Sequence, residues 1–140
     1  MNINDLLIQL KFLRELYHAA HLHVRGADAA QDHQLFGRLY SELGAEYDET
    51  YELALGAGTD LDPIQISKAT SELLTRHGNF LSSGEASNLF RTLKKHEVEL
   101  VPILRALAED ARMHAGLVTH AQDLNKTHLR RFYFLRARLP

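Results

Sequence analysis

The chain has 140 residues, of which 45% are hydrophobic and 24% are charged, and its formal net charge is −2 at pH 7. This length predicts one domain over residues 1–140, because it can bury a single core but not two. The weak negative charge argues against bulk attraction to nucleic acid, the lack of cysteine excludes disulfides and thiolate ligands, and no apolar run is long enough to span a membrane.

The amino-terminal part of the chain predicts an amphipathic helix over residues 3–25. Its stretch MNINDLLIQLKF has no basic segment followed by an apolar core, so it does not indicate a secretory signal, and we expect a cytoplasmic protein. Gly26 follows the helix and is typical of a helix end. Apolar side chains recur every three or four residues along one face, at Leu6, Leu10, Leu13, Tyr17, Ala20 and Val24.

A second helix is predicted from about residue 29 to residue 55. Asp28 and Gln31 have the spacing of a capping box at its start, and Gly56 is typical of its end. The apolar face of this helix comprises Leu35, Phe36, Leu39, Leu43, Tyr47 and Ala54.

The remaining chain predicts one short helical patch and two further helices. The patch lies between turns within residues 57–84, a third helix fits 85–113 with a kink at Pro102, and a fourth fits 117–138. No stretch alternates with a period of two, so we expect an all-α fold. Short joints favour two antiparallel hairpins, and the long middle segment favours a ferritin-like four-helix bundle with a long crossover that carries a short helix between the second and third helices.

Polar residues beside the core face of the second helix raise the question of a metal site. Asp48 and Glu52 are one helical turn apart and could hold one cation. His33 precedes Asp48 by fifteen residues, roughly 22 Å along a helix axis, so the two cannot share a metal within one chain. The first hairpin places His21 beside His33 at one end, with the carboxylates toward the other.

A second copy of the chain would bring these two halves together. Around a two-fold axis the second helix runs in reverse, so Asp48 and Glu52 of one copy would meet His21 and His33 of the other. Imidazole and carboxylate ligands suit iron, zinc or manganese. The alternative is that the carboxylates belong to a solvated helix flank and that the histidines are rim residues or hydrogen-bonded core groups.

The stretch from His21 to Gly56 resembles the Dps family, the mini-ferritins. The family signature runs histidine, tryptophan, asparagine, a hydrophobic residue, a basic residue and glycine, followed by histidine, two aspartates and glutamate at set spacings. The carboxyl-terminal RRFYFLRARL also looks like the family's aromatic-rich last helix, whereas the middle of the chain matches only in length and character. The match is ungapped and falls on His21, Val24, Arg25, Gly26, His33, Asp48 and Glu52.

The resemblance implies a hollow shell of twelve subunits, built from two-fold dimers, that oxidises ferrous iron with peroxide and stores the ferric mineral. It implies iron as the metal, with zinc or manganese as substitutes, at a ferroxidase centre between two-fold-related subunits. His21, Asp48 and Glu52 would form the tighter iron position, and His33 would serve the second. Such chemistry would protect the cell against oxidative damage.

The chain departs from the family pattern at several positions. Gly37 replaces the family's carboxylate one turn after the second histidine, so the second position keeps only His33. Leu22 replaces the usual tryptophan, and His23 stands where asparagine is common. Asp32 could swing in as a substitute ligand, although it faces elsewhere on an ideal helix.

Other histidines fall at positions of interest. His114 and His120 lie where the family has the acidic stretch that helps to line an iron entry pore. Glu15 and His18 have the E-x-x-H spacing that larger ferritins use within one subunit, but no second such motif accompanies them, so we interpret this as a chance match.

Two other functions stay open. One is a Dps-fold shell or DNA-associated structural protein whose ferroxidase centre is impaired, and the other is DNA binding and compaction. Some family members bind DNA through a lysine-rich tail, but here only about two uncharged residues precede the first helix, and the four arginines of RRFYFLRARLP are expected in a packed helix. DNA binding would therefore have to use the surface of the shell and not a basic tail.

Overall fold

The computed structural model describes residues 2–79 and 83–140. The helices are α1 (Ile3–His23), α2 (Ala29–Gly56), α3 (Pro63–His77), α4 (Ala86–Val98), α5 (Leu100–Glu109) and α6 (Ala115–Ala137). Within the two described ranges there is no strand, only an isolated bridge between Arg25 and Glu85. None of the helices in these ranges is both long and apolar enough to cross a membrane. The prediction of an all-α fold is confirmed.

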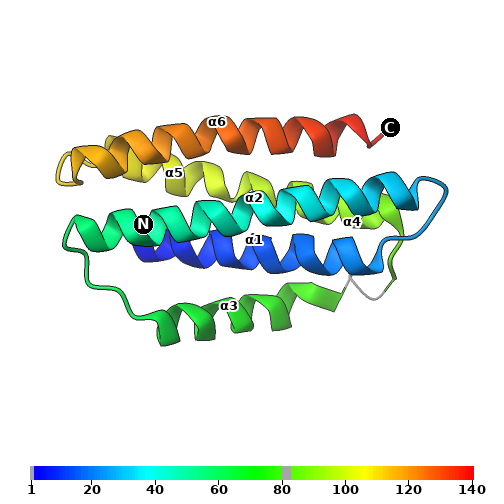
Figure 1. Ribbon diagram of the computed structural model, residues 1–140, viewed down its shortest axis with the longest axis horizontal. Coiled ribbons are helices and arrows are strands. Elements are labelled where there is room, and N and C mark those ends of the chain that lie inside the picture. The colour runs from blue at the N-terminus through cyan, green and yellow to red at the C-terminus, as the bar shows by residue number, and fades with distance from the viewer. Residues whose placement is uncertain (1, 80–82) are drawn as a thin grey trace.

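Four rods pack side by side, and a shorter helix lies against them. Figure 1 shows α1, α2, α6 and the rod formed by α4 and α5 along the long axis of the molecule. Helix α1 contacts α2, α3, α4 and α5, while α6 contacts α2, α4 and α5. Helix α3 packs along α1, so the chain passes from α2 to α4 across the outside of α1 (Figure 1).

The rod formed by α4 and α5 is interrupted, but three residues before Pro102, where the kink was expected. The break lies at Glu99, between α4 and α5, and not at Pro102. Pro102 is then the third residue of α5, inside the first turn, where helix N–H groups have no partner within the helix. The proline therefore fixes where α5 can start, and the bend precedes it.

The capping box expected at Asp28 and Gln31 is wrong. Asp28 occupies the N-cap position of α2, but its side chain makes no capping hydrogen bond. Arg138 Nη2 instead donates to the Asp28 carboxylate at 3.1 Å. A capping box is present at α1, where the Asn2 side chain accepts from the Asp5 N–H and the Asp5 carboxylate accepts from the Asn2 N–H.

Helix α1 is buried on more faces than the single apolar stripe predicted from the sequence. A surface helix normally buries a single apolar face, but α3, α4 and α5 cover other faces of α1. The predicted stripe is buried from Leu6 to Ala20, and further core residues lie outside it, namely Leu7, Phe12 and Leu16.

A buried ionic network joins all four rods at the centre of the molecule. Arg131 of α6 is 1% exposed, and its Nε donates to Glu97 Oε1 of α4 at 2.8 Å. Its Nη1 donates to Glu46 Oε1 of α2. The Glu97 carboxylate also accepts from Tyr17 of α1 at 2.7 Å and from His128 Nδ1 of α6 at 3.0 Å.

The network holds Glu97 ionised although no solvent reaches it. Burial alone would raise the pKa of Glu97, but the Arg131 guanidinium, together with the hydrogen bonds from His128 and Tyr17, brings it below the usual value. Burial raises the pKa of Tyr17 well above its usual value, and the neighbouring Glu97 charge raises it further. Glu97 is therefore a carboxylate whose charge is balanced inside the bundle.

Removal of the buried guanidinium tests this network. Arg131→Met should lower the free energy of unfolding by about 3–5 kcal/mol, because it leaves the Glu97 carboxylate buried without its cation. Arg130→Met is the matched control, because Arg130 precedes Arg131 on α6 and is exposed; it should change stability by about 0.5 kcal/mol at most. Guanidinium unfolding of both variants gives the comparison. Equal, small effects would mean that the network does not stabilise the fold.

A second buried contact ties α2 to α6. The Thr50 hydroxyl donates to the Glu46 carbonyl at 2.6 Å, so it accepts from His120 Nε2, which lies 2.8 Å away. Burial lowers the pKa of His120 from 6.5, although the Glu49 and Asp123 carboxylates act in the opposite direction. Because the folded-state pKa is depressed, the stability that His120 contributes is present above pH 6.5 and is lost as the pH falls through the folded-state pKa.

The loss of stability on acidification should therefore depend partly on His120. We expect the urea midpoint to fall between pH 7.5 and pH 5.5, and to fall less in His120→Gln, which retains an N–H donor for Thr50 but does not titrate. Urea unfolding of both proteins at the two pH values measures the difference. If His120→Gln loses as much stability as the parent protein, the pH dependence arises elsewhere.

Candidate metal centre

His21 and His33 meet at the end of the antiparallel pair α1 and α2. Their rings stack with centroids 3.8 Å apart and an interplanar angle of 18°. His21 Nδ1 lies 2.7 Å from the His33 carbonyl oxygen, and His33 Nδ1 lies 2.6 Å from the His21 carbonyl oxygen. A carbonyl only accepts, so each Nδ1 carries a proton. In the neutral form of each ring, the Nε2 lone pair is therefore free, as in metal-binding histidines.

The hairpin that presents these rings is held from two sides. The Arg25 N–H donates to the Gly84 carbonyl at 2.8 Å, which ties the turn to the segment before α4. Gly84 has a φ of +68°, and a Cβ there would lie 2.4 Å from the His23 carbonyl oxygen, so this approach requires glycine. On the other side, Arg138 holds the first turn of α2 (Figure 1 shows the carboxyl terminus at this end).

Gly37 makes room for the His21 ring. A Cβ added at Gly37 would lie 2.8 Å from both Cε1 and Nδ1 of His21, which is closer than atoms of this kind approach. Any side chain at this position would have to displace the ring or move the helices apart. From the sequence, Gly37 indicates only a missing carboxylate, and no sequence pattern indicates that a ring fills the space.

The stacked rings cannot both bind the same ion. A metal ion lies in the plane of an imidazole that binds it, about 2.0–2.1 Å from the nitrogen. The planes of His21 and His33 are nearly parallel, so they do not meet within that distance. The geometry favours one ion for each ring, as in a centre with two metal positions.

Asp48 and Glu52 lie far along α2 from the two histidines. Both carboxylates are exposed, and their separation from His33 follows from the rise of the helix, roughly 22 Å over fifteen residues. Among the described residues, no group of three or more histidines, aspartates or glutamates lies close enough to hold a metal ion. One chain therefore brings His21 and His33 together and keeps the two carboxylates apart from them.

Asp32 does not lie free as a substitute ligand. It is 1% exposed, and both of its oxygens accept from Arg138, at 3.0 Å from Nε and 3.1 Å from Nη2. Movement of Asp32 toward the rings would break a bidentate ion pair. The interpretation of Asp32 as a ligand is therefore not supported by its contacts.

His114 and His120 do not share an opening. His120 is buried against Thr50, whereas His114 is exposed and caps α6, where its Nδ1 accepts from the Gly116 N–H at 3.0 Å. In neutral His114 the proton must then be on Nε2, which leaves no lone pair for a metal. His114 and Glu52 line a common hollow of about 190 Å³ at the end of the bundle opposite the histidine pair.

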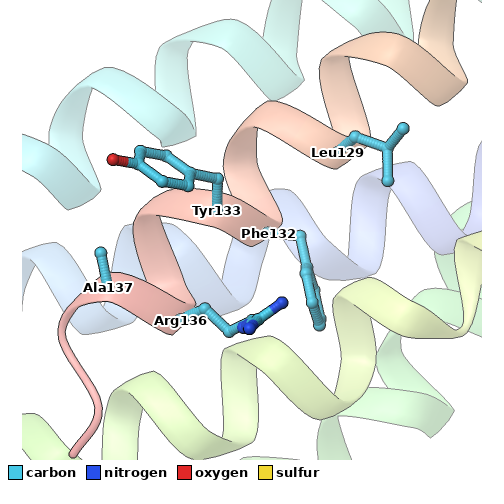
Figure 2. A pocket seen from close by; sticks show the side chains of 5 residues that line it. All are labelled: Leu129, Phe132, Tyr133, Arg136 and Ala137. Atoms are coloured by element: carbon cyan, nitrogen blue, oxygen red, sulfur yellow. The ribbon is translucent and has the colours of Figure 1, made fainter.

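A separate hollow of about 440 Å³ lies on the outer face of α6. Figure 2 shows Phe132 and Arg136 pointing toward the yellow-green helix and Tyr133 pointing the other way. Leu129 and Tyr133 are 57% and 65% exposed. The lining contains neither a carboxylate nor an imidazole, so the hollow suits an apolar contact and not a metal.

Gly37→Ala tests the close approach of His21. An added methyl group should displace the His21 ring and break the Nδ1–H hydrogen bonds of the histidine pair. Gly44→Ala is the matched control, because it lies in the same helix and its Cβ would meet only Arg14, at 3.4 Å. Both changes favour the helix by about 1 kcal/mol, so a stability gain should appear in Gly44→Ala alone. Proton NMR and thermal unfolding measure these effects, and identical results for the two variants would contradict the interpretation.

Comparison with known proteins adds no assignment, because no protein-family model matches this chain and no curated protein matches it at a significant level.

Proposed function

We propose that this chain is a Dps-like mini-ferritin. In this proposal it binds ferrous iron between two-fold-related subunits, oxidises it with peroxide, and stores ferric iron in a hollow cytoplasmic shell. The observation that carries the proposal is the pair His21 and His33, whose Nδ1 atoms are fixed by backbone carbonyls so that both Nε2 atoms remain available. These histidines stand at the spacing of the Dps signature.

The arrangement of the helices supports a ferritin-like four-helix bundle with α3 on its long crossover. In proteins of this architecture that bind two metals, the ions lie inside the bundle among glutamates and histidines of facing helices. Here Glu46, Glu97 and His128 face the interior, but the Arg131 guanidinium already supplies the cation between them. Iron chemistry would therefore have to take place at the surface, which favours a centre between subunits.

In the proposed centre, Asp48 and Glu52 of one copy face His21 and His33 of the other. The carboxylates would offset the charge of iron in both oxidation states, and each imidazole would donate one lone pair. Two ferrous ions would give one electron each to hydrogen peroxide, which with two protons yields two ferric ions and two molecules of water. A paired transfer of this kind avoids release of a one-electron product, the hydroxyl radical.

An assembly of many copies is part of the proposal. The apolar hollow on α6, with exposed Leu129 and Tyr133, supports a further subunit contact apart from the histidine pair. A shell of twelve subunits needs the two-fold contact at the histidine pair and at least one further contact that joins the dimers to one another.

A second candidate is a Dps-fold shell whose ferroxidase centre is impaired. It is favoured by Gly37, because the place of the family's carboxylate is filled by the His21 ring. Such a shell could act through its surface, including on DNA. Two of the four carboxyl-terminal arginines are engaged within the chain, Arg131 in the core and Arg138 with Asp32, so they do not form a free basic tail.

Loss of the carboxylates should abolish iron oxidation. Ferrous iron is added anaerobically to the assembled protein, peroxide follows, and ferric absorbance is recorded for the parent protein and for Asp48→Ala/Glu52→Ala. We expect rapid oxidation and a retained mineral only with the parent protein. Assembly with oxidation no faster than in the double variant would support the impaired shell.

Mixed assemblies test whether the centre lies between subunits. His21→Ala/His33→Ala and Asp48→Ala/Glu52→Ala should each be inactive alone. After dissociation and joint reassembly in equal amounts, about a quarter of the sites should contain intact residues from both copies, because only one site in each mixed dimer is complete. No recovery of oxidation, with mixed dimers confirmed by mass spectrometry, would exclude a shared centre.

A further inference from the structure

Two histidines outside the proposed iron centre meet where α3 ends against the bundle. His77 is the last residue of α3, and His96 lies on α4. Their ring centroids are 4.9 Å apart with an interplanar angle of 60°. Phe12 of α1 closes the group, with its ring centroid 5.0 Å from that of His96 and 6.1 Å from that of His77.

His96 is held in one orientation by its neighbours. The ring is buried, and its Nδ1 lies 3.0 Å from Oε2 of Glu99. Gln9 Nε2 donates both to the His96 carbonyl at 3.0 Å and to the same Glu99 oxygen at 3.3 Å. A carboxylate at Nδ1 keeps the proton on that nitrogen and leaves Nε2 as the ligand atom, which is the support that metal-binding histidines receive.

His77 is also suited to donate a lone pair. Burial lowers its pKa, and the adjacent His96 ring lowers it further, so the ring is neutral at pH 7. Within the described ranges, its ring contacts are those with Phe12 and His96.

The spacing of the two rings matches that of two imidazoles on one ion. With nitrogens about 2.1 Å from a tetrahedral ion, two bound rings have centroids roughly 5 Å apart and inclined planes. The pair His77 and His96 has both properties, whereas His21 and His33 are too close and too nearly parallel. The difference is one of geometry, since all four ligands are imidazoles.

We propose that His77 and His96 bind one divalent transition-metal ion of the zinc type, which fastens α3 to α4. Imidazole nitrogen favours zinc, copper or nickel over magnesium and calcium. Water would complete the coordination, because no third protein ligand of the usual kinds joins the pair within the described residues. Binding to the folded chain alone would stabilise it, chiefly at the end of α3, where His77 meets His96 of α4.

Zinc titration of a chain without the proposed iron centre tests the site. The background is His21→Ala/His33→Ala/Asp48→Ala/Glu52→Ala, and zinc binding is measured by calorimetry at pH 7.5. We expect one zinc ion per chain, which is lost in His77→Phe, a variant that keeps an aromatic ring against Phe12.

His18→Phe is the control, because the His18 ring also stacks on an aromatic ring, with its centroid 4.4 Å from that of Tyr40, but has no second histidine beside it. Glu99→Gln should weaken binding roughly tenfold through loss of the carboxylate behind His96.

Hydrogen exchange separates metal binding from aromatic packing. Zinc should slow amide exchange in the last turn of α3 in the background chain and in the His18→Phe control, but not in His77→Phe. Unchanged zinc affinity in His77→Phe, or equal protection of α3 in all three proteins, would overturn the proposal and leave only packed rings. His77→Phe in the otherwise unaltered chain should oxidise iron as fast as the parent protein does. The proposed zinc site and the proposed iron centre can therefore be refuted separately.

Discussion

The buried cation Arg131 is the constraint on which the rest of the structure depends. Its guanidinium donates to Glu97 and Glu46, and Glu97 in turn accepts from Tyr17 and His128, so α1, α2, α4 and α6 meet around one buried cation. A buried ion pair adds little stability compared with apolar packing, but the loss of one partner is strongly destabilising. The network therefore fixes which helix faces meet.

The same cation decides where metal chemistry can occur. Glutamates and a histidine of facing helices would suit a metal inside the bundle, but the Arg131 guanidinium already occupies the place between the two carboxylates. Outside this network, two pairs of histidines have different geometries. His21 and His33 are stacked and fit one ion for each ring, whereas His77 and His96 are inclined and fit one ion between them. Ring orientation, which the backbone carbonyls and Glu99 fix, separates the two sites.

Predictions that depended on the apolar face of a single helix were confirmed. The apolar stripe of residues 3–25 is buried as predicted from Leu6 to Ala20. The prediction of a capping box was wrong, because a side chain from the end of α6 competes for the carboxylate. Asp28 does not cap α2, because Arg138 binds its carboxylate, and Asp32 is held in the same way. His120 bonds Thr50 inside the bundle and does not line a pore with His114.

The sequence by itself determined the helical class, the approximate helix bounds and the separation of His33 from Asp48, since periodicity and the rise of a helix depend only on positions along the chain. It also placed His21 near His33 through the short turn between them. Only the tertiary structure decided that their rings stack and that the His21 ring lies over Gly37, that Arg131 lies in the core, and that His77 meets His96. These contacts join different helices, and their geometry depends on how the helices pack.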